Sequence, residues 1–189
     1  MSTISTFLSV SADGFFAGPN GEIDWFHSVE QTKDYHEFTH SQASSHNTLF
    51  LGRTTYEMMK SYWPTPDAIK ADPQMADAVN NSRKVVFSKT LRSLEEGPNW
   101  KHLELRHDID RDEILALKRQ NDVTILGSGS IVQQLTNLVL MDSYMLAIVP
   151  VVLGNGKPLF KDVQKTKLKL EDSKSFDNGV VVNTYSPYR

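Results

Sequence analysis

Short apolar runs alternate with amphipathic segments along most of the chain. Five runs predict buried strands, because each places at least three apolar residues between polar or turn-forming ones. They cover residues 2–10, 47–52, 84–89, 122–127 and 143–154. Pro150 lies inside the longest run and predicts a bend or bulge there. Strands alternating with helical segments predict an α/β fold.

Capping signals mark the starts of the helices between these strands. Asp72 precedes Pro73, which places a capping residue before a proline at the first helical position. Asp110 and Glu113 have the spacing of a capping box. A further helix is predicted by apolar residues at positions i, i+4 and i+7, namely Ile131, Leu135 and Leu138.

The C-terminal part of the chain is rich in strand-forming residues. Residues 167–176 and 179–186 predict two strands, with Asp177, Asn178 and Gly179 at the turn between them. This pattern is typical of an antiparallel hairpin. The 189 residues contain no repeat, low-complexity tract or linker, and 39% of them are hydrophobic. We therefore expect a single domain over residues 1–189.

The composition of the chain argues against several classes of binding partner. The net charge is −3 and no run of Lys or Arg occurs, which argues against nucleic acid. No apolar run approaches the roughly 20 residues that cross a bilayer, and the N-terminus has no charged segment typical of a signal peptide. We expect a soluble, cytoplasmic protein without a membrane partner. Because the chain has no cysteine, disulfides, thiol nucleophiles and Cys-ligated metals are excluded.

A glycine-rich turn, "TILGSGSIVQQL", connects a predicted strand to a predicted helix at residues 124–135. Gly127 and Gly129 would let a phosphate approach the helix N-terminus, although a tight turn alone also needs glycine. The Rossmann dinucleotide pattern fails, since Val132 replaces its third glycine and no acidic residue ends the following strand. The turn also occurs late in the chain. A dinucleotide, if bound, requires another fold.

Two other strand ends carry groups that bind anions. One is the segment "LGRTTYE", with a glycine, a guanidinium and two hydroxyls at a helix start, and the other is "FSKT". Each alone could be a capped helix start or a solvated loop. Parallel strands place their carboxyl ends at one edge of a sheet, where open α/β folds bind ligands. The residues concerned are Gly52, Arg53, Thr54, Thr55, Ser88, Lys89 and Thr90.

The order of these motifs resembles that of a known family. The first strand, "SADGFFAG", "DW", "LGRTTYE", "FSKT", "ILGSGSIVQQL" and "VVLGNGKPLF" follow one another as in dihydrofolate reductase-like proteins. Within that family, the motifs resemble the branch that is similar to the reductase domain of the bifunctional riboflavin-biosynthesis deaminase-reductase. The resemblance spans nearly the whole chain. It implies a mostly parallel central sheet flanked by helices, with NADPH laid across the strand ends.

The resemblance also implies roles for single residues. Gly52, Arg53, Thr54 and Thr55 would contact the pyrophosphate and adenosine, while Ser88 and Lys89, followed by Thr90, would meet the 2′-phosphate. The pyrophosphate would lie against Gly127, Ser128, Gly129, Ser130 and Ile131. Paired cations at Arg53 and Lys89 favour NADPH over NADH, because only NADPH brings an additional dianion to that corner.

The resemblance also implies where the substrate binds. The loop around "AGPNGEIDW" resembles the mobile flap that closes the nicotinamide pocket in this family. Asp24 corresponds to the carboxylate that binds and helps to protonate a pterin, and Asp13 is a second candidate acid. Both could instead be turn formers or caps, and Trp25 could be a lid over the core. The expected substrate pocket comprises Ala12, Gly14, Trp25, Leu153 and Gly154.

A competing motif lies in "HEFTHSQASSH". His36, Glu37 and His40 match the H-E-x-x-H pattern of zinc proteases, and His46 falls at the third histidine of a metzincin. Ala43 replaces the glycine at which metzincins bend, and "SQASS" can continue the helix. His46 would then lie about 15 Å along the axis from His36. A solvated helix face with Tyr35 and Phe38 toward the core is the alternative, and we expect no metal.

The sequence therefore predicts an NADPH-dependent reductase. It would transfer hydride to a small heterocycle, such as a pterin-, flavin- or pyrimidine-like ring, or to a ring-opened sugar derivative. A non-catalytic NADPH sensor is the alternative, since the same motifs would serve it. Deamination is excluded because the zinc site of deaminases needs cysteine. We also expect a homodimer, formed through the long apolar strand or the C-terminal hairpin.

Overall fold

The computed structural model describes residues 2–43 and 46–188 of the chain. The chain divides into two compact units. The first unit comprises Met1–Thr3 and Thr39–Ser128, and the second comprises Ile4–Phe38 and Gly129–Arg189. The expectation of a single domain stays a prediction.

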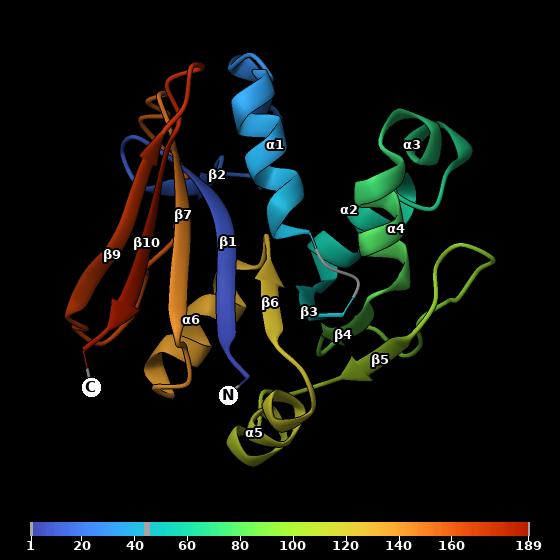
Figure 1. The fold of residues 1–189 in the computed structure, drawn as a ribbon. Coiled ribbons are helices and arrows are strands. Elements are labelled where there is room, and N and C mark those ends of the chain that lie inside the picture. Colours follow the sequence, from blue (N-terminus) through green and yellow to red (C-terminus); the bar gives the residue numbers. More distant parts are fainter. Residues whose placement is uncertain (1, 44–45, 189) are drawn as a thin grey trace. The chain divides into compact units, whose positions relative to one another are not determined.

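The first unit is built on parallel strands in the order β5-β4-β3-β6 (Figure 1). The strands are β3 (Thr48–Gly52), β4 (Arg83–Phe87), β5 (Leu103–Arg106) and β6 (Val123–Leu126). The helices are α2 (Arg53–Tyr62), α3 (Pro66–Ala71), α4 (Pro73–Asn81) and α5 (Arg111–Gln120). Because Gly52 pairs with Phe87, and Phe50 pairs with Ile125, the carboxyl ends of β3, β4 and β6 lie at one edge.

Burial explains why these segments are strands. Phe50, Leu51, Val85, Val86 and Ile125 are all 0% exposed. Neighbouring residues on a strand point to opposite faces, so both faces of these strands are covered. Continuous apolar runs, rather than alternating ones, are the pattern expected of such strands, and this is what the sequence contains.

The predicted helix caps are confirmed in the first unit. The Asp72 side chain accepts a hydrogen bond from Met75 N at 3.0 Å, and Pro73 begins α4. Asp110 accepts hydrogen bonds from the backbone N–H groups of Asp112 and Glu113, each at 3.0 Å. These bonds satisfy N–H groups that a helix leaves without an internal partner.

The second unit is a mixed β structure. Strand β7 (Ser143–Val149) pairs in parallel with β1 (Ile4–Ser11) and antiparallel with β10 (Val181–Pro187), which pairs antiparallel with β9 (Leu168–Ser175). Short strands β2 (Phe15–Ala17) and β8 (Lys157–Pro158) form a separate pair. Helix α6 (Gly129–Asn137) and the short 3₁₀ helix η1 (Asp24–Ser28) also belong to this unit.

An aromatic cluster forms part of the core of the second unit. Helix α1 (Lys33–Gln42) contributes Tyr35, which is buried, and Phe38, which packs beside it. The Phe176 ring lies 5.1 Å from each of these two rings, centroid to centroid. Trp25 and Val180 are buried in the same cluster. This confirms that Tyr35 and Phe38 point toward the core.

The predicted fold class is confirmed: the strand pairing is mostly parallel, helices flank the sheet, and the C-terminal hairpin is antiparallel. All five predicted strands form, and β7 ends at Val149, directly before Pro150. The sequence analysis did not identify α3, β2, β5 or β8. Among the described residues, no helix has both the length and the apolar character needed to cross a membrane.

A buried lysine organises the start of β4. Lys84 is 0% exposed, and its Nζ lies 4.5 Å from the centroid of the Trp100 ring. It donates hydrogen bonds of 2.8 to 3.1 Å to the carbonyl oxygens of Asn80, Ser82 and Lys101. Burial lowers the pKa of Lys84 to about 8. One ammonium group thus connects the end of α4 to the segment before β5.

This lysine predicts a stability that rises with pH above about 8. The unfolded chain binds the Lys84 proton up to about pH 10.4, whereas the folded chain releases it near 8, so deprotonation favours folding between these values. Between pH 7.5 and 10, wild type should gain about 2 kcal/mol relative to Lys84→Met. Urea unfolding at several pH values measures this, with the exposed Lys70→Met as control. Parallel curves for wild type and Lys84→Met would contradict it.

Candidate functional site

The ends of β3 and β6 meet in the first unit, as the sequence predicts. The Gly52 N–H donates to Ser128 Oγ at 2.6 Å. The same oxygen lies 3.2 Å from Thr55 Oγ1 and 3.1 Å from the Leu126 carbonyl oxygen. Ser128 and Thr55 are buried. Their hydroxyls therefore connect the glycine-rich turn to the start of α2.

The end of β4 joins the same edge. Arg53 Nη1 donates to Thr90 Oγ1 at 3.0 Å. Ser88 Oγ accepts hydrogen bonds from Thr90 N at 3.3 Å and Leu91 N at 3.1 Å. The three predicted segments, 52–55, 88–90 and 127–128, are thus linked by side-chain contacts within one unit.

Backbone donors at this edge suit an anion. Helix α2 has ten residues, and Gly52 at its N-cap provides no side-chain hydrogen bond. The first N–H groups of any α-helix have no partner within the helix, and they carry the positive end of the helix dipole. In α2, no side chain of the N-cap residue takes their place as a partner. Gly127 has a φ of +61°, and a Cβ added there would lie 3.2 Å from the Thr55 side chain. Glycine at this position therefore permits both the positive φ and the close contact with Thr55.

Each cation of the edge has an acidic neighbour that the sequence analysis did not consider. Arg53 Nε pairs with Glu57 at 2.8 Å, and Lys89 Nζ lies 3.6 Å from Asp108. Lys89 and Asp108 are both largely exposed, with side chains 83% and 79% accessible. The i, i+4 spacing of Arg53 and Glu57 was readable from the sequence. The contact between Lys89 and Asp108 was not readable from the sequence, because Asp108 follows strand β5, which was not predicted.

The remaining predicted cofactor residues lie in the second unit. Gly129 begins α6, with Ser130 and Ile131 in its first turn. A Cβ on Gly129 would lie 2.6 Å from the Phe16 ring, so this glycine allows close packing. Ile131 is 2% exposed. Its side chain belongs to the core, which leaves its backbone as the part available to a ligand.

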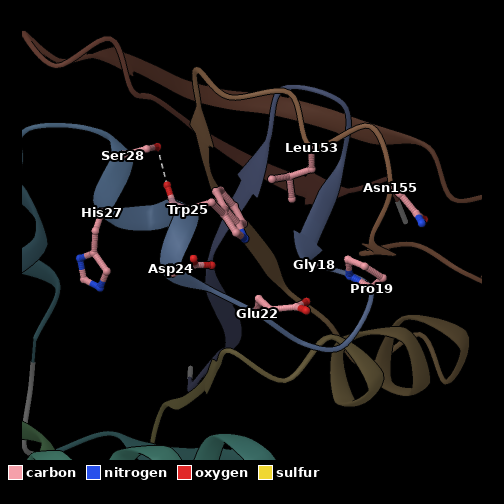
Figure 2. A pocket seen from close by; sticks show the side chains of 9 residues that line it. All are labelled: Gly18, Pro19, Glu22, Asp24, Trp25, His27, Ser28, Leu153 and Asn155. Atoms are coloured by element: carbon pink, nitrogen blue, oxygen red, sulfur yellow. Dashed lines mark hydrogen bonds between the residues drawn. The ribbon is translucent and has the colours of Figure 1, made fainter.

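A pocket of about 560 Å³ opens in the second unit around η1 (Figure 2). Of the predicted substrate-side residues, Asp24, Trp25 and Leu153 line it, whereas Ala12, Asp13, Gly14 and Gly154 do not. The sequence analysis did not single out Glu22 and His27, which also line it. The full lining is Gly18, Pro19, Glu22, Asp24, Trp25, His27, Ser28, Leu153 and Asn155.

Asp13 holds a turn together. Its Oδ1 accepts hydrogen bonds from Ser11 Oγ at 2.6 Å and Leu153 N at 3.1 Å, and its Oδ2 accepts one from Gly154 N at 2.8 Å. The Ser11 hydrogen bond, with those from the backbone, lowers the pKa of Asp13. These bonds favour the ionised carboxylate and fit the alternative that Asp13 is a turn former, while its role as a catalytic acid stays a prediction.

Asp24 and Trp25 differ from Asp13 in having unused hydrogen-bonding groups. Asp24 begins η1 and is exposed, and its carboxylate has no hydrogen-bond partner among the described residues. Trp25 is 8% exposed, and within the described part of the chain its buried Nε1 has no hydrogen-bond partner. Both residues line the pocket, where Asp24 is exposed and Trp25 Nε1 is buried.

Two residues of the protease-like motif have acidic or basic partners in the structure. Glu37, the expected base, lies 3.7 Å from Lys33 on an exposed face of α1. His40 Nε2 contacts Asp72 Oδ2 at 2.7 Å, and its Nδ1 lies 3.3 Å from Gln74 Oε1. Helix α1 ends at Gln42. The stretch over which the sequence allowed it to continue includes residues 44–45, which lie outside the described residues.

The fold is dihydrofolate reductase-like. The chain superposes on dihydrofolate reductase from Enterococcus faecalis, complexed with NADP(H), with a TM-score of 0.59 and 19% identity over 99% of this chain and 97% of the other. A Shewanella sp. PV-4 protein, whose name links it to riboflavin biosynthesis, gives a TM-score of 0.76 and 22% identity over 99% of each chain.

More specifically, the RibD C-terminal domain model matches residues 2–182, and the chain belongs to that family. YyaP of Bacillus subtilis, itself uncharacterized, is 31% identical over 181 residues, which cover 94% of this chain and 91% of YyaP. The family predicted from the order of the sequence motifs is therefore confirmed.

Substitution of Gly127 tests the turn at the strand ends. Gly127→Ala should destabilise the protein by about 1–2 kcal/mol, because alanine is strained at positive φ and its Cβ crowds Thr55. Urea unfolding measures the change. Gly97→Ala is the matched control, since an added Cβ there meets no atom within 4 Å. Equal stability of the two variants would contradict the strained-turn interpretation.

Substitution of Asp13 tests its structural role. In Asp13→Ala the amide protons of Leu153 and Gly154 lose their acceptor, so their hydrogen exchange should accelerate by roughly tenfold. Exchange followed by NMR measures this directly. Asp24→Ala is the control, because it removes a carboxylate that accepts neither proton. Unchanged exchange in Asp13→Ala would show that the turn does not depend on Asp13.

Proposed function

We propose that the protein is an NADPH-dependent reductase of small heterocyclic or ring-opened sugar substrates. Membership of the RibD C-terminal domain family supports a reductase, and the NADP(H) complex of the enterococcal neighbour supports a nicotinamide cofactor. The observation that carries the proposal is the convergence of the β3, β4 and β6 ends. That edge brings the N-terminus of α2 and two cations, Arg53 and Lys89, into one unit.

The residues present fit the phosphates of a dinucleotide. The start of α2 would bind the pyrophosphate through backbone N–H groups. Gly127 has no side chain that would hinder the approach of the pyrophosphate to the turn. Arg53 and Lys89 would bind the 2′-phosphate beside Ser88 and Thr90. When bound, the nicotinamide supplies the hydride. The protein's own task is to fix the position of the substrate and to exclude water.

The pocket around η1 suits the substrate. It combines an apolar wall at Trp25 and Leu153 with polar groups at Asp24, His27 and Asn155. Small-molecule sites characteristically consist of apolar walls with a few convergent polar groups. As a carboxylate, Asp24 would accept a hydrogen bond from the substrate ring, and only its protonated form would pass the ring a proton.

We also propose a homodimer, formed through the C-terminal hairpin, which is one of the two expected routes. Strand β7 pairs with β1 on one side and β10 on the other, so its backbone cannot pair across a two-fold axis. Strand β9 pairs with β10 and presents Leu170, which is 52% exposed. Light scattering measures the mass, and a monomer at micromolar concentration would exclude the dimer.

A nucleotide titration tests the cofactor. Wild type should bind NADPH at least about tenfold more tightly than NADH, and Arg53→Ala and Lys89→Ala should each lose about fivefold to thirtyfold for NADPH alone. Nucleotide fluorescence measures the affinities, with Lys70→Ala as a surface-lysine control. Binding of neither nucleotide would overturn the proposal. NADPH binding without oxidation by any pterin, flavin or pyrimidine acceptor would favour the sensor.

Removal of the acidic neighbour of Lys89 tests the same assignment through a gain in NADPH affinity. Asp108→Asn removes the negative charge 3.6 Å from Lys89. If Lys89 binds the 2′-phosphate, this variant should bind NADPH about twofold to threefold more tightly and NADH unchanged. Raising the salt concentration should reduce the gain. A gain shared equally by both nucleotides would place the 2′-phosphate elsewhere.

A further inference from the structure

Three Asn-Gly steps lie in the second unit, at Asn20, Asn155 and Asn178. An asparagine that precedes glycine loses its side-chain amide most readily, because glycine has no Cβ to hinder attack by its own backbone nitrogen on that amide. In a folded chain the rate depends on whether hydrogen bonds restrain the asparagine side chain and the glycine N–H. The structure restrains two of these steps and leaves the third open.

Asn20 is held on both sides of the reacting bond. Its backbone N–H and its Nδ2 donate to the Glu22 carboxylate at 2.9 and 2.7 Å, respectively. The Gly21 N–H donates to the Gly18 carbonyl oxygen at 3.0 Å. The side chain that would be attacked and the nitrogen that would attack are therefore both engaged.

Asn178 is restrained in the same way at the turn between β9 and β10. Its Nδ2 donates to the Glu30 carbonyl oxygen at 2.9 Å, and its Oδ1 accepts a hydrogen bond from the Val180 N–H at 3.1 Å. The Gly179 N–H donates to the Phe176 carbonyl oxygen at 2.9 Å. Ring closure at this step would have to disrupt these hydrogen bonds.

Asn155 lacks such restraints. It is exposed on the rim of the pocket around η1, in a bend before β8, and Figure 2 shows its amide directed away from η1. Its side chain and the Gly156 N–H have no hydrogen-bond partner within the described part of the chain. The anchoring of this loop by Asp13 ends one residue earlier, at Gly154. Both reacting groups of this step are consequently free to approach one another.

We propose that Asn155 is a site of spontaneous deamidation. The Gly156 nitrogen attacks the Asn155 side-chain carbonyl carbon, the new C–N bond closes a cyclic imide, and ammonia leaves with the proton released by that nitrogen. Water then opens either carbonyl of the imide, which gives aspartate or isoaspartate at residue 155. The net reaction consumes water, releases ammonia and needs neither an oxidant nor a reductant. The inference does not depend on the proposed function.

The modification would add a negative charge to the pocket around η1. Glu22 and Asp24 already line this pocket, and none of the described residues that line it is a lysine or an arginine. A further carboxylate at residue 155 would therefore make the pocket less favourable for an anionic ligand.

Isoaspartate would also disturb the backbone beside β8. The main chain of isoaspartate runs through the former side-chain carbonyl, which inserts an additional carbon before Gly156. Gly156 has little room to shift, since a Cβ added to it would lie 2.5 Å from the Ala17 carbonyl oxygen. Ala17 pairs with Lys157 where β2 meets β8. We therefore expect isoaspartate, but not aspartate, to loosen this strand pair.

Peptide mapping of aged protein tests the site. Wild type is incubated in mildly alkaline buffer, digested, and analysed by mass spectrometry with fragmentation that separates isoaspartate from aspartate. Asn155 should deamidate at least about fivefold faster than Asn20 and Asn178, the factor that corresponds to one hydrogen bond lost on ring closure. In urea-unfolded protein the three steps should react at similar rates. Reaction of native Asn155 no faster than the other two would overturn the proposal.

Two variants test the cause. Glu22→Ala removes the acceptor of both Asn20 hydrogen bonds, so the Asn20 rate should rise about fivefold while the Asn155 rate stays unchanged. Asn155→Gln should slow modification at residue 155 strongly, because glutamine would have to close a larger ring. An unchanged Asn20 rate in Glu22→Ala would show that these hydrogen bonds do not set the rates, and would overturn the structural argument for Asn155.

Hydrogen exchange tests the consequence for the fold. Ion-exchange chromatography isolates the deamidated protein, because it carries an additional negative charge. In the isoaspartate form, the amide protons of the β2–β8 pair should exchange at least about tenfold faster than in fresh protein. Asn155→Asp is the control, since it adds the charge without lengthening the backbone, and it should exchange like wild type. Unchanged exchange in the isoaspartate form would overturn the expected loosening of β8.

Discussion

The candidate cofactor site depends on the parallel pairing of β3, β4 and β6. Parallel strands end at the same edge, so residues distant in sequence converge there without long loops. The hydrogen bond from Gly52 N to Ser128 Oγ then fixes the spacing between two of these ends. It also occupies the hydroxyl of Ser128. The groups left for a ligand are mainly backbone donors, which a helix start presents in a fixed direction.

The burial of the strands makes this convergence rigid. Most residues of β3, β4 and β6 are apolar and buried, and the polar residues considered for ligand binding follow the strands. Lys84 is the exception, since it lies inside and donates to three carbonyl oxygens. Its contacts stabilise the beginning of β4, at the end of the strand opposite the candidate site. Structural and ligand-binding polar groups are thus separated along the same strand.

Much of this fold could be read from the sequence because its signals are local. Apolar runs located the buried strands, and Asp72 and Asp110 located helix starts, because capping depends on residues a few positions apart. Strand β5 was missed, since all four of its residues are only half-buried and its sequence, "LELR", contains two charges. The neighbour of Lys89 was missed with it. The role of Asp13 depends on backbone donors 140 and 141 residues away, which no local pattern reveals.

The candidate sites of the two units differ in their charges. The first unit carries Arg53 and Lys89 at its strand ends, each partly neutralised by an acidic neighbour, which keeps the edge attractive to a phosphate without a large excess of positive charge. The pocket in the second unit is lined by carboxylates and an unsatisfied indole donor. If these are the cofactor and substrate sites, phosphate binding is favoured at the first and disfavoured at the second. A reductase arranged in this way would distinguish its two ligands by charge before shape, and a substrate with its own phosphate would lose that distinction.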